Sequence, residues 1–228
     1  MALNRTRTRT IAGVVGALLI AAPLAACSSE DEGSGSGGSS SSSAPEPVAV
    51  VEDVKGQTTQ VTLDQGFVDA ITGLGLTPAA VGGGELVDGA LRFPISGGNV
   101  TVFTPGEVSP YVIGQLQHEG SGFTLTAGDT EVTIGNLNVD PGVSRVYGDV
   151  LLNGDPVVSS AYIFRLNGST LMPLEADADA GTATLEGTEV YVSDVAAQLL
   201  NDTFGTDAVT DQLLVGIAKI TVNTGAGS

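Results

Sequence analysis

The chain has 228 residues, of which 42% are hydrophobic and only 15% are charged, and its formal net charge is −18. This apolar content excludes an acidic disordered polymer, and the prominence of Val, Thr and Gly argues against a helical bundle. Only five basic residues follow residue 27, too few for a phosphate-neutralising surface, so nucleic-acid binding is excluded.

Residues 1–26 have the pattern of a secretory signal peptide. Three arginines precede residue 10, and the apolar run over residues 11–24 is short for a helix that crosses a bilayer. The run leads into Leu24-Ala25-Ala26-Cys27. This segment resembles the lipobox of bacterial lipoproteins, in which the signal is cleaved between Ala26 and Cys27 and the cysteine thiol receives a diacylglycerol. A signal peptide with a chance cysteine is the alternative.

The lipobox resemblance implies a lipoprotein held at the extracytoplasmic face of the cell membrane by acyl chains such as palmitate. Cys27 is the only cysteine, which excludes an intramolecular disulfide. Without residues 1–26, five basic side chains stand against 26 acidic ones, a net charge of −21. Anionic headgroups repel such a domain, so the acyl chains and not a basic patch would anchor it.

The rest of the chain divides at residue 47. Residues 27–47 comprise the lipidated Cys27 and a low-complexity tether rich in Gly, Ser and Pro, which has nothing apolar to bury. Residues 48–228 are expected to form a single β-rich extracytoplasmic domain.

The apolar pattern of this domain predicts many strands. We expect a strand over residues 57–63, then a short helix capped by Asp64, and alternating strands from residue 85 onward. A second short helix should begin at Ser193 or Asp194 and end at Gly205, before a last strand over residues 213–222. The predicted fold is mainly β: an antiparallel β-sandwich or partly closed barrel with two short helices.

Turn residues refine this prediction. Asn153-Gly154 and Asn167-Gly168 tolerate positive φ at both positions and predict tight hairpins. Glu186-Gly187 predicts another. The alternation of apolar residues changes from even to odd positions across Gly135-Asn136, which indicates a β-bulge.

His118 is the only histidine and a candidate ligand-binding residue, and we expect it in a half-exposed turn. A Ser-His-Asp hydrolase would have this single base, and the chain has no Gly-x-Ser-x-Gly elbow between a strand and a helix. Zinc sites built from several His and Cys side chains are excluded.

Four acidic residues imitate part of an EF-hand calcium loop. Glu175, Asp177, Asp179 and Glu186 occupy positions 1, 3, 5 and 12 of such a loop, but Gly181 comes one position late and the flanks are not helical. An acidic loop that aids solubility is the favoured interpretation, and a weak extracellular calcium site is the alternative.

Three segments resemble the HtaA haem-binding domain of actinobacterial surface proteins, over roughly residues 58–152. They are a short helix with Gly66-Phe67, a strand and turn over Phe93–Gly98, and Gly114–Leu125, which contains His118. The resemblance implies a β-rich fold and haem held by a tyrosine of the first helix, supported by a histidine. The matching helix position here is about Ala70, so the iron ligand is missing, whereas His118 matches the supporting histidine.

Tyr111 is the tyrosine nearest in sequence to His118 and lies seven residues before it, along one predicted strand. An odd separation places two side chains on opposite faces of an extended strand, so we expect that they cannot bind one iron together unless a bulge intervenes. Tight haem binding is therefore not expected.

The sequence thus predicts a lipid-anchored binding or cell-envelope interaction module, whose further partner is an unidentified envelope protein or small ligand. No cofactor and no enzymatic activity are expected. The alternatives are a haem-binding HtaA-like surface domain and an undetected hydrolase.

Overall fold

A computed structural model describes residues 44–224, so the predictions for the signal peptide, Cys27 and most of the tether lie outside the described residues. Within this range, thirteen strands and two helices follow one another. Their order and bounds are β1 (Ala49–Val51), β2 (Gln57–Leu63), α1 (Gln65–Gly73), β3 (Thr77–Gly82), β4 (Glu85–Val87), β5 (Ala90–Pro94), β6 (Gly97–Val102), β7 (Val112–Ala127), β8 (Thr130–Asp140), β9 (Arg145–Leu152), β10 (Asp155–Asn167), β11 (Glu175–Asp177), β12 (Thr182–Val192), α2 (Asp194–Phe204) and β13 (Leu214–Asn223).

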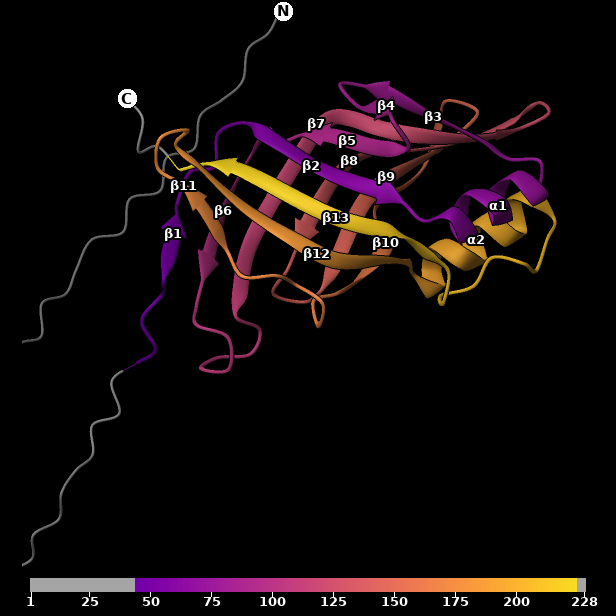
Figure 1. The fold of residues 1–228 in the computed structure, drawn as a ribbon. Coiled ribbons are helices and arrows are strands. Elements are labelled where there is room, and N and C mark those ends of the chain that lie inside the picture. Colours follow the sequence, from indigo (N-terminus) through magenta and orange to yellow (C-terminus); the bar gives the residue numbers. More distant parts are fainter. Residues whose placement is uncertain (1–43, 225–228) are drawn as a thin grey trace, which may run out of the picture. The chain divides into compact units, whose positions relative to one another are not determined.

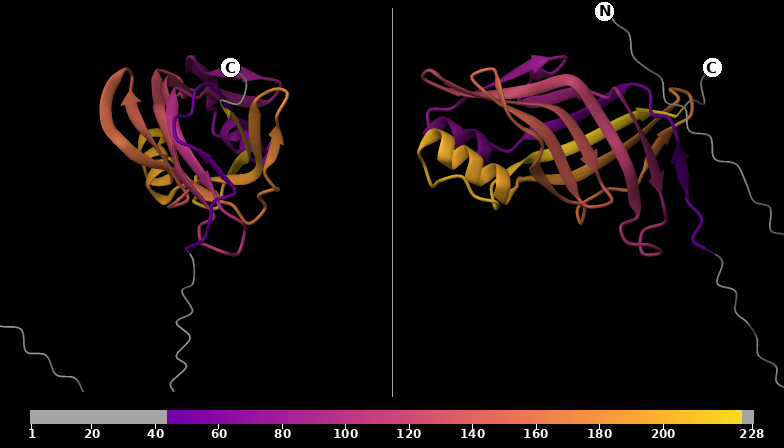
Figure 2. Two further views of the ribbon diagram at one scale, coloured as in Figure 1. Left: turned by 90° about the vertical axis from the view of Figure 1, so that its left-hand side faces the viewer. Right: turned by 180° about the vertical axis from the view of Figure 1, so that it is seen from behind.

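The strands of residues 44–224 form one antiparallel sheet that curls into a half-barrel (Figures 1 and 2). Its order is β1-β6-β7-β8-β9-β10-β12-β13-β2-β5-β4, with β11 paired to β12. The long strand β7 pairs with β6 through its first half and with β3 through its second half. The prediction of a mainly β fold with two short helices is confirmed, and the partly closed barrel is the architecture adopted.

Both helices lie together at one end of the half-barrel, away from β1 and β11 (Figure 1). Helix α1 begins after Asp64, whose side chain accepts a hydrogen bond from the Gly66 amide, as predicted. Helix α2 begins after Ser193, whose hydroxyl accepts from the Ala196 amide at 2.9 Å. It ends at Gly205 in the left-handed conformation, which is also as predicted.

The hairpin predictions had mixed outcomes. Asn153 and Gly154 have φ of 51° and 87° and form the expected tight turn between β9 and β10. The hairpin predicted at Asn167-Gly168 is wrong, because β10 ends there in a loop and pairs with β12 instead.

The hairpin predicted at Glu186-Gly187 is wrong as well, because β12 continues through both residues with a register shift against β13. The shift is a bulge that frees backbone oxygens, and the preceding loop satisfies them. The Met172 amide donates to the Glu186 oxygen at 2.8 Å, and the Thr170 hydroxyl donates to the Gly187 oxygen at 2.6 Å. Tertiary hydrogen bonds therefore stabilise a bulge where the local sequence favours a turn.

Adjacent strands carry bulges at neighbouring positions, and these bulges bend the sheet. The predicted bulge at Gly135-Asn136 is confirmed by a register shift between β8 and β9 and by a φ of 50° at Asn136. The carboxylate of Asp149 in β9 accepts from the Asn136 side chain at 3.0 Å and from the Ser160 amide of β10 at 2.9 Å. These hydrogen bonds, the one from Asn136 first, hold the pKa of Asp149 below its usual value.

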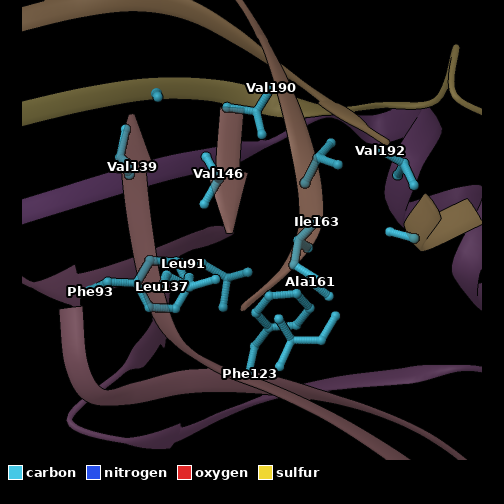
Figure 3. Close-up of a cluster of buried hydrophobic side chains, with 14 of the residues drawn as sticks. Leu91, Phe93, Phe123, Leu137, Val139, Val146, Ala161, Ile163, Val190 and Val192 are labelled. Atoms are coloured by element: carbon cyan, nitrogen blue, oxygen red, sulfur yellow. The ribbon is translucent and has the colours of Figure 1, made fainter. Parts of the chain in front are cut away.

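Apolar side chains from the inner face of the curled sheet form the core (Figure 3). Phe123 lies between two other aromatic rings, with centroid distances of 6.4 Å to Phe93 and 6.0 Å to Phe164. Ile163 of β10 and Val146 of β9 are buried in the same cluster. Among residues 44–224, no helix combines the length and apolarity that a membrane crossing requires.

Candidate functional site: the lumen of the half-barrel

The curled sheet encloses a cavity of about 440 Å³, here called the lumen. Phe67 of α1 and Ala196 and Leu200 of α2 line it at the helical end. At the other end the lining includes Val50 of β1, which is 52% exposed, so the lumen reaches solvent there. Its volume lies within the range typical of small-molecule sites, about 300–1,000 Å³.

The lumen wall is almost entirely apolar, and no Asp, Glu, Lys or Arg of residues 44–224 lines it. The absence of charge is informative because residues 44–224 contain 23 acidic side chains, and alternation places those of the strands on the outer face. The polar side chains of the lining are those of Thr59, Tyr111, His118, Ser144, Thr188 and Thr224.

His118 lies in β7 and is only 1% exposed, so the prediction of a half-exposed turn is wrong. The physical reason is that β7 does not end near this residue. It continues to Ala127 across a register shift between His118 and Gly122, and the shift keeps apolar residues inward on both sides. The Ser121 hydroxyl donates to the His118 carbonyl oxygen at 3.0 Å within this bulge.

The hydrogen bonds of the His118 ring define its protonation. Nδ1 lies 3.1 Å from the Leu137 carbonyl oxygen, which can only accept, so Nδ1 carries the proton. Nε2 lies 2.8 Å from the Thr59 hydroxyl and accepts from it. Burial lowers the pKa of His118 to about 4, although the hydrogen bond to Leu137 opposes this shift. At neutral pH the ring is therefore uncharged, and both of its nitrogens already have partners.

The pair of Thr59 and His118 has the spacing of a nucleophile and a base, but its surroundings do not favour catalysis. The Nδ1 partner is a carbonyl and not a carboxylate, and a histidine with a pKa near 4 is a weak base at neutral pH. Sequence reasoning missed Thr59, although a signal was present. Thr59 shares the inward phase of β2 with Val61 and Leu63, so a polar side chain interrupts an apolar face.

Tyr111 and His118 both line the lumen, so the prediction that they face opposite sides is wrong. The reason is that Tyr111 precedes β7, which begins at Val112, and strand alternation does not extend to it. The intervening strand nevertheless separates the two residues by roughly 20 Å at about 3.3 Å per residue. They cannot bind one iron together.

The residues present do not fit the haem ligation that the HtaA resemblance implies. Helix α1 contains no tyrosine, and Ala70 presents only a methyl group at the matching position. The ring nitrogens of His118 are engaged with Leu137 and Thr59. The lumen also offers haem propionates no cationic side chain of residues 44–224.

The four candidate calcium ligands are not brought together. Glu175 and Asp177 are exposed in β11, and Asp179 is exposed in the turn that follows. The Asp177 carboxylate accepts from the Ala180 amide at 2.9 Å, and Glu186 of β12 forms an ion pair of 3.0 Å with Lys219. Residues 44–224 contain no group of three or more acidic, His or Cys side chains placed to hold a metal ion.

Comparison with known proteins places the fold. The chain matches no family profile and no curated protein sequence. Among solved structures, it is similar to the C-terminal domain of HtaA from Corynebacterium glutamicum, with 15% identity and a TM-score of 0.53 over 75% of this chain and 97% of that one. The heme binding protein HtaB from the same organism aligns at 9% identity with a TM-score of 0.46, over 77% of this chain and 96% of that one. The likeness to the HtaA domain shows a shared fold.

Proposed function

We propose that this protein is a lipid-anchored, extracytoplasmic binding module whose half-barrel holds an uncharged apolar molecule or chain in its lumen. The observation that carries the proposal is the lumen itself, about 440 Å³ in volume and lined by no Asp, Glu, Lys or Arg of residues 44–224. Apolar pockets with a few polar groups are the usual form of small-molecule sites.

The uncharged, apolar wall of the lumen favours an uncharged, apolar ligand. Transfer of an ionised group into an apolar cavity costs several kcal/mol unless a partner neutralises it, and the wall provides no such partner. His118 and Thr59 satisfy each other, so they do not require a polar ligand. An apolar chain gains about 25 cal/mol for each Å² that it removes from water, with no compensating charge needed.

Anchoring follows from the lipobox pattern at Cys27. Acyl chains on this residue would hold the domain at the extracytoplasmic face of the membrane. The tether over residues 28–47 would allow the domain to move some distance from the membrane surface. A module that binds apolar molecules would then lie next to the membrane, where such molecules are concentrated.

Titration with the neutral fluorescent probe N-phenyl-1-naphthylamine tests the lumen. The probe should become strongly fluorescent on binding, and Ala183→Trp should weaken binding because Ala183 of β12 lines the lumen. Thr184→Trp is the matched control, because its side chain lies on the opposite face of the same strand. Equal binding by both variants, or no binding by the unmodified protein, would show that the lumen is not the site.

Haem is a second candidate ligand, favoured by the fold shared with the HtaA domain. The residues argue against it, since α1 lacks a tyrosine and His118 is engaged. Haem titration followed at the Soret band should therefore give no stoichiometric complex in the low micromolar range. A stoichiometric complex that His118→Ala abolishes would make haem the first candidate.

A further inference from the structure

Five arginine and tyrosine side chains gather on the outer face of β9, β10 and β12. They are Arg145, Tyr147, Tyr162, Arg165 and Tyr191, here called the arginine–tyrosine cluster. Their strand neighbours Val146, Phe164, Leu166, Val190 and Val192 line the lumen, which places the cluster on the opposite, solvent face. The mature chain has only three arginines and four tyrosines, so most of both types lie in this one place.

Each guanidinium of the cluster rests on an aromatic ring. The Cζ atom of Arg145 lies 4.5 Å from the centroid of Tyr162, and that of Arg165 lies 4.4 Å from the centroid of Tyr191. The rings of Tyr147 and Tyr162 are 6.1 Å apart. Stacking of this kind restrains the arginines and leaves the guanidinium edges available for hydrogen bonds.

The two arginines are direct cross-strand partners in the ladder of β9 and β10. Like charges in this arrangement destabilise a sheet. Neither arginine has an ion-pair partner within residues 44–224, where the ion pairs are Lys55 with Asp53 and Lys219 with Glu186. An acidic domain thus keeps two adjacent cations without a carboxylate between them.

The other groups around the cluster do not neutralise it. The Glu189 carboxylate accepts from the Tyr191 hydroxyl at 3.1 Å and from the Asn167 side chain at 2.7 Å. Asp194 influences Arg145 only through longer-range attraction, and the largest influence on this guanidinium is its hydrogen bond with the Tyr147 side chain. Apart from its stacking on Tyr191, Arg165 makes one weak hydrogen bond, which Nη2 donates to the Asp211 carbonyl oxygen at 3.4 Å.

We propose that the arginine–tyrosine cluster binds a phosphate group of an external ligand, through Arg145 and Arg165 together. A phosphate offers enough acceptor oxygens to take hydrogen bonds from two guanidiniums at once, and its charge offsets the repulsion between them. The strongly acidic remainder of the domain repels anions at long range, so binding should depend on these short-range contacts. The site is independent of the lumen.

The test uses the full mature chain with Cys27→Ala, so that no acyl chain contributes. Glucose 6-phosphate, followed by calorimetry at low salt, represents a soluble phosphate, and sedimentation with phosphatidylglycerol vesicles, against phosphatidylcholine vesicles, represents a lipid headgroup. Arg145→Gln and Arg165→Gln should each weaken binding about tenfold, whereas Lys219→Gln, which removes one cation elsewhere, should change it less than about twofold. Arg165→Lys keeps the positive charge but loses the planar guanidinium, which can donate two parallel hydrogen bonds. This variant should also weaken binding.

Dependence of either probe on both arginines supports the site, and the probe that binds identifies the source of the phosphate. Both arginines lie on the outer face, so we expect the variants to keep the melting temperature of the unmodified protein. An unchanged melting temperature establishes that a variant folds. Failure of both probes to bind the unmodified cluster, or equal weakening by Lys219→Gln, would overturn the proposal.

Discussion

Acidification should destabilise this protein through one residue, His118. The ring is 1% exposed, uncharged at neutral pH and hydrogen-bonded at both nitrogens. Protonation of Nε2 would break the hydrogen bond that the Thr59 hydroxyl donates and would place a cation in a wall without carboxylates. The folded state therefore resists protonation more strongly than the unfolded state does.

The size of the effect follows from the two pKa values of His118. The value is lowered from 6.5 to about 4 in the folded state, so the unfolded chain binds more protons between these limits. The stabilising contribution is complete above pH 6.5 and is lost as the pH falls toward 4. The loss amounts to about 2 kcal/mol at pH 5 and about 3 kcal/mol at pH 4.

Urea unfolding followed by circular dichroism between pH 7.5 and pH 4 measures this loss. Carboxylates also titrate near the lower limit, so His118→Gln serves as the reference, because glutamine keeps a donor and an acceptor and does not titrate. The free energy of unfolding should fall more steeply in the unmodified protein than in His118→Gln, by the amounts above. Parallel pH profiles of the two proteins would refute the reasoning.

Three further predictions concern the anchor, the tether and the core. Cys27→Ala in the native host should move the protein from the membrane fraction to the medium, and a mutant that stays membrane-bound after normal processing would contradict the lipobox interpretation. A chain that starts at Val48 should keep the melting temperature of the mature protein to within a few degrees, because residues 28–47 contain little to bury. Phe123→Ala should lower the free energy of unfolding by about 3–5 kcal/mol in urea titrations, since the ring is 5% exposed. The exposed Val157→Ala is its control and should change the same quantity by less than about 0.5 kcal/mol.

The sequence alone determined those features that depend on local backbone chemistry. Asp64 and Ser193 cap the two helices, Gly205 ends the second one, and Asn153-Gly154 turns the chain, because each needs only its own conformational preference and nearby amides. The bulge at Asn136 was visible because it shifts the phase of the apolar residues. Strand alternation also indicated a mainly β fold.

Tertiary structure decided what depends on register between distant strands. Glu186-Gly187 is a bulge because the loop that contains Met172 donates a hydrogen bond to it. His118 is buried because β7 continues past it and places it opposite Leu137 and next to Thr59. The lumen exists only once the sheet curls, and Arg145 and Arg165 become neighbours only when β9 pairs with β10. Periodicity shows which residues share a face of one strand, but cross-strand pairing depends on bulges and loops whose hydrogen bonds are not local.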